Sequence, residues 1–540
     1  MTNILTIIPL AWKPTNLIHA WYNNLPDGMI PINSKPVIGH ILDDLIEREI
    51  NDVLLLLNKN DIYTEKYVLL RYNNKINLNF HYVKNENDWI LWSIYEWFNS
   101  IENNNYSKVF IYLWDTIYKG KLKLEKSFLT VLKDFSNSSL WCFIEDWKFI
   151  NKPSNYKWNW KILTWLYFFN NIKFFSESIF INNKWQLYNL LEDYWKKEKF
   201  ELFESEWWYD IWNIENYYKA KIDFLKVRSF NSVIYDDIYW TIKKSSSNNE
   251  KIKQEINWYL NIPYELKIFS PRLINYNLWN NTNYEIEFYW YQSLWDLYLF
   301  WYLKDTVWYS IIDKLFFTLD LFKKYKTYQP YSFFFDIYYT KTIQRIAKMK
   351  ENTYFNELYY QKQLIINWIE YKNINYFIVN LEKYIEKLYD SKDITFIHWD
   401  FCLSNILYDT SNKIIKMIDP RWYFWELWVY WDIKYDIAKL RHSLVWSYDF
   451  IVSDLFKIEE DNNSFDFKIY NEELHENISK YFDIKLQEKL WNIESIKLIE
   501  ALLFLTMIPL HNDNFERQKA MYLIAVQKFN SIIFDMLWQK

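Results

Sequence analysis

The chain has 540 residues, enough for roughly two to four domains, and its net charge of −5 comes without a basic stripe of the kind that binds nucleic acid. Two distant cysteines, Cys142 and Cys402, exclude a disulfide framework and a cysteine zinc site. The longest apolar run, residues 501–510, is too short to cross a bilayer, and the first residues lack the features of a signal peptide. We therefore expect a soluble, cytoplasmic protein that does not insert into membranes.

Glycine and tryptophan occur in unusual numbers. The chain has 3 Gly and 32 Trp, whereas ordinary usage of about 7% would give roughly 38 glycines. Turns with positive φ depend on glycine, so a large folded enzyme with three glycines is physically implausible. Four of the tryptophans lie in the turn-rich segment 421–432. We hypothesise an alternative genetic code, in which most of these positions are glycine encoded by UGA; the alternative is a truly tryptophan-rich protein.

The first part of the chain alternates buried strand-like runs with amphipathic helical runs. ILTIIPLA (residues 4–11) and NDVLLLLN (51–58) have the length and β-branching of strands, and residues 35–50 between them have helical spacing. KVFIYLWDTIY (108–118) predicts a further strand that ends in Asp115. This alternation predicts a doubly wound, Rossmann-like α/β sheet that binds ligands at the carboxyl ends of its strands.

The pattern changes after about residue 220. Antiparallel strands are expected first, followed by a helix over NEKIKQEINWYL (249–260). NILYDTSNKIIKMID (405–419) predicts a hairpin, with two alternating strands around the turn residues 410–413. The remainder of the chain is expected to be largely helical. The simplest division is two domains, residues 1–222 and 223–540.

The segment FIHWDFCLSNILYD (396–409) carries the most specific chemical pattern. Asp400 and Asn405 are separated by four residues, and Asp419 follows the predicted hairpin. Phosphoryl transfer from ATP needs an aspartate to orient the acceptor hydroxyl, and an amide oxygen and a second carboxylate to hold Mg²⁺. These three residues supply such groups on one rigid unit. The alternative is a surface loop with capping Asp and Asn residues.

With glycine at Trp399, the segment resembles the aminoglycoside phosphotransferase and choline kinase superfamily, and YWDIKYDIAKL (430–440) adds to the resemblance. The resemblance implies a two-lobed, protein-kinase-like α+β domain that uses ATP and Mg²⁺. It implies that Asp400 is the catalytic base and that His398 braces the loop. Asn405 and Asp419 match the metal ligands.

The ATP side of such a domain needs a lysine on a strand and a helix carboxylate that holds it. TIKKSS offers Lys243 and Lys244, and the following helix offers Glu255. Side chains alternate along a strand, so only one of the two lysines faces the nucleotide. We favour Lys243.

IIPLAWKPTN (7–16), with glycine at Trp12, resembles the phosphate loop of sugar-nucleotide pyrophosphorylases and related nucleotidyltransferases. Lys13 would supply a catalytic positive charge, and Lys35 matches the family's second lysine, so Trp12 and Lys35 are expected at the nucleotide. Where the family has Pro-Lys, this chain has Pro26 followed by Asp27.

Two later segments continue this resemblance. FIYLWDTI (110–117) matches the strand-end aspartate of the family, and YDIWNIENYY (209–218) matches its late metal-binding segment. Asp115 and Asp210 are therefore expected to share one Mg²⁺ that bridges the phosphates of an NTP, either CTP or UTP/dTTP.

Together the two resemblances predict a bifunctional enzyme. One domain would phosphorylate a sugar or amino-alcohol, and the other would transfer a nucleotidyl group onto a phosphomonoester, for capsule or surface polysaccharide synthesis. The partners would be small molecules and nucleotides. The alternatives are a kinase with a silent, ligand-binding N-terminal domain, an antibiotic kinase, and a non-catalytic binding protein if the tryptophans are real.

Overall fold

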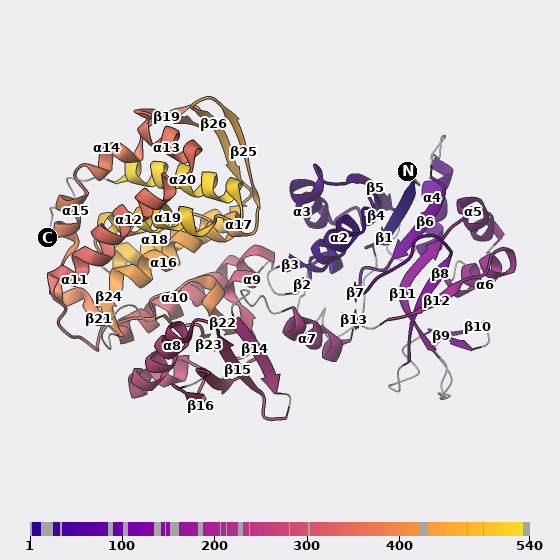
Figure 1. The fold of residues 1–540 in the computed structure, drawn as a ribbon, viewed down its shortest axis with the longest axis horizontal. Coiled ribbons are helices and arrows are strands. Elements are labelled where there is room, and N and C mark those ends of the chain that lie inside the picture. The colour runs from indigo at the N-terminus through magenta and orange to yellow at the C-terminus, as the bar shows by residue number, and fades with distance from the viewer. Residues whose placement is uncertain are drawn as a thin grey trace. The chain divides into compact units, whose positions relative to one another are not determined.

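The computed structural model describes residues 3–11, 25–32, 35–84, 90–100, 106–133, 142–145, 147–151, 161–181, 187–205, 207–211, 213–224, 231–236, 238–279, 281–300, 303–421, 429–471, 473–489 and 491–532. The chain forms two compact units, Met1–Leu225 and Lys226–Lys540 (Figure 1), which we call the N-terminal and C-terminal units.

A nine-stranded sheet forms the centre of the N-terminal unit. Seven strands follow the order β10-β9-β11-β6-β1-β4-β5, and β8 pairs with β11 and β12 beside this path. The parallel strands at its core are β1 (Ile4–Pro9), β4 (Asp52–Asn58), β5 (Asn77–Val83) and β6 (Lys108–Tyr112). β11 (Lys161–Phe169) runs antiparallel to β6. The predicted α/β architecture with a parallel core is confirmed.

Helices cover both faces of this sheet. Figure 1 shows α2 and α3 on one side and α4, α5 and α6 on the other. Their bounds are α2 (Val37–Glu47), α3 (Ile62–Tyr72), α4 (Ile90–Ser100), α5 (Ile172–Ile181) and α6 (Leu187–Lys197). Ile7 of β1 shares a core with Leu91 of α4, while Ile8 on the opposite face of the strand is also fully buried. Burial of both faces explains the nearly continuous apolar sequence of the strand.

Short elements complete the N-terminal unit. They are η1 (Asp27–Met29), β2 (Pro31–Ile32), β3 (Lys35–Pro36), β7 (Thr116–Lys119), β8 (Phe128–Leu132), β9 (Cys142–Glu145), β10 (Lys148–Asn151), β12 (Glu201–Glu204), β13 (Trp207–Asp210) and α7 (Ile214–Asp223). The single strand expected over 108–118 is in fact two strands, because β6 ends at Tyr112 and β7 begins at Thr116. Asp115 therefore lies in the turn between them.

The C-terminal unit begins with an antiparallel sheet of order β14-β15-β17-β16. Its strands are β14 (Asn231–Asp236), β15 (Thr241–Ser246), β16 (Leu273–Asn277) and β17 (Asn283–Glu287), and the helix α8 (Asn249–Asn261) packs against them. Ile252 and Ile256 of α8 are fully buried. The predicted antiparallel strands and the helix after them are confirmed.

The predicted hairpin is also confirmed. β22 (Ile406–Asp409) and β23 (Ile414–Met417) pair antiparallel around the four expected turn residues, and β18 (Gln292–Ser293) adds a third strand. β21 (Ile394–Phe396) precedes the loop that contains Asp400 and pairs with β24 (Tyr430–Asp432).

The rest of this unit is mostly helical. Its elements are η3 (Tyr264–Phe269), α9 (Leu294–Phe300), α10 (Asp305–Phe322), α11 (Tyr331–Phe335), η4 (Asp336–Thr340), α12 (Lys341–Met349), α13 (Thr353–Tyr360), α14 (Ile374–Ile378), α15 (Leu381–Leu388), η5 (Ser391–Asp393), η6 (Leu403–Asn405), α16 (Ile433–Leu444), α17 (Tyr448–Val452), α18 (Glu473–Glu488), α19 (Ile493–Met507), η7 (Ile508–Leu510) and α20 (Phe515–Ser531). A helical remainder was expected, but β25 (Phe456–Asp461) and β26 (Ser464–Ile469) form a hairpin there. It joins β19 (Gln363–Ile366) and β20 (Ile369–Lys372) in a four-stranded sheet.

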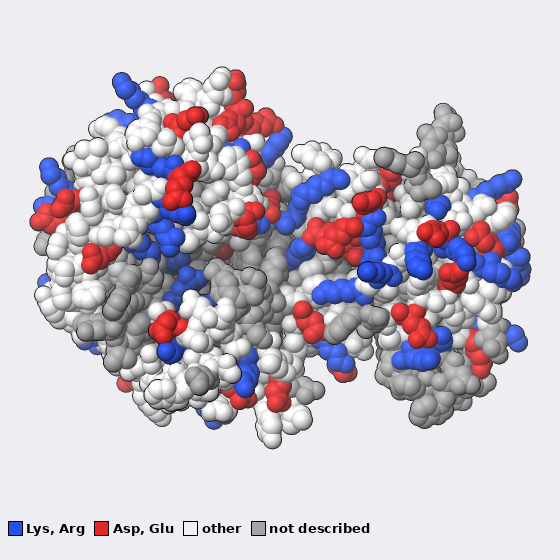
Figure 2. All heavy atoms as spheres, in the orientation of Figure 1, with Lys and Arg blue, Asp and Glu red and all other residues white. Residues whose placement is uncertain are grey.

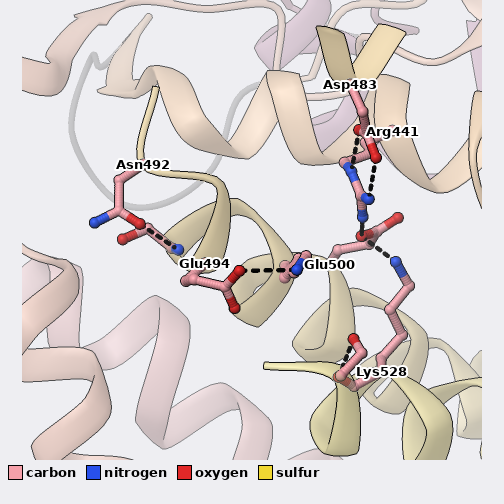
Figure 3. Close-up of polar contacts among 9 residues, drawn as sticks. Arg441, Asp483, Asn492, Glu494, Glu500 and Lys528 are labelled. Atoms are coloured by element: carbon pink, nitrogen blue, oxygen red, sulfur yellow. Dashed lines mark hydrogen bonds and ion pairs between the residues drawn. The ribbon is translucent and has the colours of Figure 1, made fainter. Parts of the chain in front are cut away.

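Buried charges connect four helices of the C-terminal unit (Figure 3). Arg441 of α16 donates to Glu500 of α19, with 2.6 Å between Nη1 and Oε2, and makes two hydrogen bonds to Asp483 of α18. Lys528 of α20 contacts the same oxygen of Glu500. Glu500 and Lys528 are fully buried. Loss of one partner would leave an uncompensated buried charge, so this network ties the packing of the four helices together.

Left-handed backbone occurs repeatedly at tryptophan. Among the described residues, thirteen other than glycine have positive φ, and five of them are Trp147, Trp165, Trp240, Trp368 and Trp399. A positive φ is an outlier for a bulky side chain and ordinary for glycine. The backbone at these five positions is thus of the kind that glycine adopts.

The charged side chains of both signs are interspersed over the face drawn in Figure 2. In the described part of the chain, no helix combines the length and the apolar character needed to cross a bilayer.

Candidate functional site

The loop between β21 and η6 holds Asp400 in a buried position. Asp400 is 6% exposed. Its Oδ2 lies 2.8 Å from Nε of Arg421, and its Oδ1 lies 3.1 Å from Nζ of Lys439. Burial alone would raise the pKa of this carboxyl group, but the two cations outweigh burial and hold the pKa well below its usual range. Asp400 is therefore an ionised carboxylate at neutral pH.

His398 lies two residues before Asp400 and is held in the loop by buried contacts. Its side chain is fully buried, and its ring meets the ring of Trp258 edge to face at 5.4 Å between centroids. Its backbone N–H donates to Oδ2 of Asp436 at 2.6 Å. Burial lowers the pKa of His398 to about 4, so the imidazole is neutral near pH 7. These contacts hold His398 in place within the loop, and its bracing role stays a prediction.

Trp399 lies between these two residues with a φ of 69°. Its indole stacks on Trp431, with 5.3 Å between ring centroids, and only 5% of its surface is exposed. The loop thus takes a left-handed turn immediately before Asp400, which a glycine would make without the steric cost of a Cβ atom.

The hairpin brings the two expected metal ligands to neighbouring positions. The backbone N–H of Ile418 donates to the carbonyl of Asn405 at 2.9 Å, so Asp419 directly follows the residue paired with Asn405. The amide Nδ2 of Asn405 donates to the carbonyl of Asp400 at 3.0 Å. This bond uses the amide nitrogen, while Oδ1 of Asn405 accepts a hydrogen bond from the hydroxyl of Ser404 at 3.4 Å. An amide oxygen beside a carboxylate is a donor set that suits Mg²⁺.

Lys244, and not Lys243, makes the ion pair expected on the ATP side. Nζ of Lys244 lies 2.8 Å from Oε2 of Glu255 and 2.8 Å from Oδ1 of Asp419. Lys244 and Glu255 are 5% and 2% exposed, whereas Lys243 is exposed to solvent. The preference for Lys243 is therefore corrected. Residue 244 points toward α8 because β15 alternates its side chains and the helix covers that face.

Glu255 is fixed by a second contact. The hydroxyl of Tyr284 on β17 donates to Oε2 of Glu255 at 2.6 Å. The strand lysine, the helix carboxylate and the residue after the hairpin thus come together from three elements that are distant in sequence.

In the N-terminal unit, acidic residues gather where β6 gives way to β7. Asp210 is the partner of Thr116 in the β7–β13 pair, and the backbone N–H of Ile211 donates to the carbonyl of Asp115 at 2.7 Å. Burial, together with the negative charge of Asp27, raises the pKa of Asp115 to about 7. The backbone at Asp115 thus lies beside that at Asp210, and Asp27 is close enough for its charge to act on Asp115, while the sharing of one Mg²⁺ by Asp115 and Asp210 stays a prediction.

The remaining expected residues of this unit have different outcomes. Lys35 on β3 forms an ion pair with Asp43 of α2. Trp12 and Lys13 lie outside the described residues. Over the described ranges, no group of three or more His, Cys, Asp or Glu side chains is arranged to hold a metal ion.

Two residues that contact Asp400 were not expected from the sequence. Arg421 follows Asp419 by two positions, a spacing that could have drawn attention to it. Lys439 lies on α16, and nothing in its local sequence indicates that its side chain reaches Asp400.

Neither a protein-family model nor a curated protein matches the chain. Three solved structures are each similar to 42% of it, in its N-terminal part. One is described as a glucose-1-phosphate thymidylyltransferase from Bacillus anthracis, in complex with sucrose (14% identity, 96% of that chain covered, TM-score 0.35). The second is a UDP-glucose pyrophosphorylase complexed with UDP-glucose (16%, 99%, 0.33), and the third an inositol-1-phosphate CTP transferase from T. maritima (10%, 97%, 0.33).

Proposed function

We propose that the C-terminal unit is an ATP-dependent phosphotransferase that acts on a hydroxyl group of a small molecule. The observation that carries this proposal is the joining of Lys244, Glu255 and Asp419 on one side of the Asp400 loop. Lys244 would bind the phosphates of ATP, and Asn405 and Asp419 would hold Mg²⁺. When bound, this ion would neutralise charge on the phosphates.

In the proposed reaction, Asp400 orients the acceptor hydroxyl. A bond forms between the hydroxyl oxygen and the γ-phosphorus, and the bond from that phosphorus to the ADP oxygen breaks. The hydroxyl proton passes to Asp400 and then to water. Because Arg421 and Lys439 hold the carboxylate ionised, it orients the hydroxyl throughout and receives the proton late.

For the N-terminal unit we propose nucleotidyl transfer onto a phosphomonoester, with CTP or UTP/dTTP as donor. Asp115 and Asp210 would hold Mg²⁺ near the carboxyl ends of the parallel strands, where doubly wound sheets bind ligands. The phosphomonoester made by the C-terminal unit could serve as acceptor, as in the supply of precursors for capsule or surface polysaccharide.

A specific observation favours a second candidate, in which the N-terminal unit binds a nucleotide or sugar without reacting it. Asp27 stands where the resembled family has a lysine, and its negative charge acts on Asp115. Lys35, which matches the family's second lysine, forms an ion pair with Asp43. A phosphate site with an added carboxylate in place of a cation is poorly suited to stabilise the charge of nucleotidyl transfer.

We also propose that most tryptophans of the chain are glycines in the natural protein. The five left-handed tryptophans support this, and so do the indole N–H groups of Trp295, Trp308 and Trp446, which are buried without an acceptor among the described residues. Buried indole N–H groups ordinarily have one. Mass spectrometry of the natural protein would show glycine at these positions, and UGG codons there would contradict the idea.

One experiment tests both activities. The protein is expressed with glycine at its UGA codons and screened with ATP against sugars and amino-alcohols, and each phosphomonoester product is then offered to CTP and UTP. The bifunctional proposal predicts ADP formation that depends on the acceptor, followed by pyrophosphate release. ADP without pyrophosphate would favour the second candidate, and the absence of both would contradict the proposal.

A further inference from the structure

The two cations that contact Asp400 are held in different ways. Lys439 comes from helix α16, its side chain is 12% exposed, and its Nζ lies 3.1 Å from Oδ1 of Asp400. Arg421 comes from the loop after β23, its side chain is 51% exposed, and its Nε lies 2.8 Å from Oδ2. The buried lysine already pairs with the charge of this carboxylate, so the half-exposed arginine can make a further contact.

The backbone fixes Arg421 relative to both halves of the proposed site. Its N–H donates to the carbonyl of His398 at 3.1 Å, two residues before Asp400. Asp419, which pairs with Lys244 at 2.8 Å, lies two residues before Arg421. Arg421 is thus tied to the carboxylate proposed to orient the acceptor and, through two residues of backbone, to the groups proposed to hold Mg²⁺ and the phosphates of ATP.

The guanidinium of Arg421 has donors beyond the one that contacts Asp400. Arginine carries five N–H donors in a planar fork, and the contact with Asp400 uses Nε. Over the described residues, neither Nη group of Arg421 makes a hydrogen bond. Both Nη groups can therefore donate to a ligand, and a fork of parallel N–H donors matches the oxygens of a phosphoryl group.

The geometry of phosphoryl transfer sets the distance that such an arginine has to span. The acceptor oxygen lies about 2.7 Å from the carboxylate that orients it and about 3.0–3.5 Å from the phosphorus that it attacks. The phosphoryl group is therefore within about 6 Å of Oδ2 of Asp400. A guanidinium that contacts Oδ2 through one nitrogen and donates about 2.9 Å from another covers a comparable distance.

We propose that Arg421 binds the γ-phosphoryl group of ATP through its Nη groups while its Nε keeps the contact with Asp400. It would be a catalytic residue that stabilises the negative charge on the phosphoryl oxygens and holds this group at a fixed distance from Asp400. Arg421 would stay protonated and take no part in the proton transfer. Lys439 would be a positioning residue, acting only through Asp400. The inference rests on the proposed phosphotransferase function.

The test measures the Kd of the full chain for ADP and for the non-hydrolysable analogue adenylyl imidodiphosphate, each with Mg²⁺. The two nucleotides differ by the γ-phosphoryl group, so the ratio of the two Kd values reports the contacts of that group. Arg421→Gln should weaken binding of the analogue by about tenfold, the effect of one lost charge-assisted contact, and leave the Kd for ADP unchanged. Arg421→Lys keeps the charge without the fork and should recover part of the loss. Lys439→Gln should change the ratio by less than about threefold.

Kinetics with an accepted acceptor give a second readout. Arg421→Gln should lower kcat by at least about 100-fold, because the contact is strongest in the transition state. Arg272→Gln is the matched control, since the side chain of Arg272 is 74% exposed and pairs with Glu287, and it should leave kcat and the Kd ratio unchanged.

The two proposals fail in different ways. An unchanged Kd ratio in Arg421→Gln, or an equal change of this ratio in Lys439→Gln, would overturn the inference and leave the phosphotransferase proposal intact. If Arg421→Gln does not fold, the ratio in Arg421→Lys decides in the same way. Failure to phosphorylate any acceptor, with the same ATP turnover in Asp400→Asn as in the parent, would overturn both.

Discussion

Replacement of Lys244 by methionine should destabilise the C-terminal unit strongly. At 2.8 Å and an effective dielectric constant of about 20, the contact of Lys244 with the buried Glu255 is worth about 6 kcal/mol before the cost of burial is subtracted, whereas the contact with Asp419, whose side chain is 52% exposed, is screened by solvent and worth less. Removal of the lysine leaves Glu255, which is 2% exposed, with less compensation for its charge. Breaking a buried pair in this way costs about 3–5 kcal/mol of unfolding free energy.

Glu255→Gln and the double variant complete a thermodynamic cycle. The double variant should lose about 1–3 kcal/mol less than the two single losses added together, because the second change removes a charge that the first left uncompensated. Urea denaturation gives the unfolding free energies, and hydrogen-exchange mass spectrometry assigns the transition to residues 231–532. Such assignment is needed because a chain with two units does not have to unfold in one step.

Lys243→Met is the matched control for this cycle, since it removes the same side chain from the adjacent, exposed position of β15. Its cost should stay within about 0.5 kcal/mol. Equal losses for Lys243→Met and Lys244→Met would refute the reasoning about the buried ion pair.

Three further predictions concern stability. Asp449 has a pKa of about 7 in the fold against 3.8 in the unfolded chain, so the contribution of this group to folding stability is fully present below pH 3.8 and is lost as the pH rises to 7. Asp449→Asn should therefore stabilise the protein at pH 8, by at most about 4 kcal/mol, and not at pH 4. An equal effect of the substitution on the unfolding free energy at both pH values would contradict this. Glu500→Gln should lower the unfolding free energy, measured by denaturant titration, by about 3–5 kcal/mol. This loss should be clearly larger than that of Asp483→Asn, because the side chain of Asp483 is 30% exposed, and the reverse order would argue against the buried network. Trp399→Gly should be about 1–2 kcal/mol more stable than Trp399→Ala, because the Cβ atom of alanine is strained in the left-handed backbone at φ 69°. Equal thermal unfolding temperatures for the two variants would remove this support for glycine at position 399.

The sequence predicted those parts of the fold in which local pattern and tertiary packing agree. The hairpin of β22 and β23 has alternating apolar residues around a polar turn, and its register then places Asp419 beside Asn405. The parallel strands were recognisable because they are buried on both faces and therefore continuously apolar.

Other features depend on contacts that a local pattern does not contain. The choice between Lys243 and Lys244 depends on which face of β15 is covered by α8, and alternation gives only the two options. The contact of Lys439 with Asp400 depends on how α16 packs beneath the loop. The hairpin of β25 and β26 did have a usable signal, since FKIEEDNNSFDFKI (456–469) alternates around a central Asn pair.

The most direct test of this account is the rate of γ-phosphoryl transfer by Asp400→Asn, measured with labelled ATP and an accepted acceptor. Asp409→Asn is the control, because it makes the same chemical change at the turn of the adjacent hairpin, away from the proposed reacting groups. We predict a loss of at least about 100-fold in kcat for Asp400→Asn, with little change in KM for ATP and none for the control. Full activity of Asp400→Asn would contradict the assignment of this loop as a phosphotransferase site.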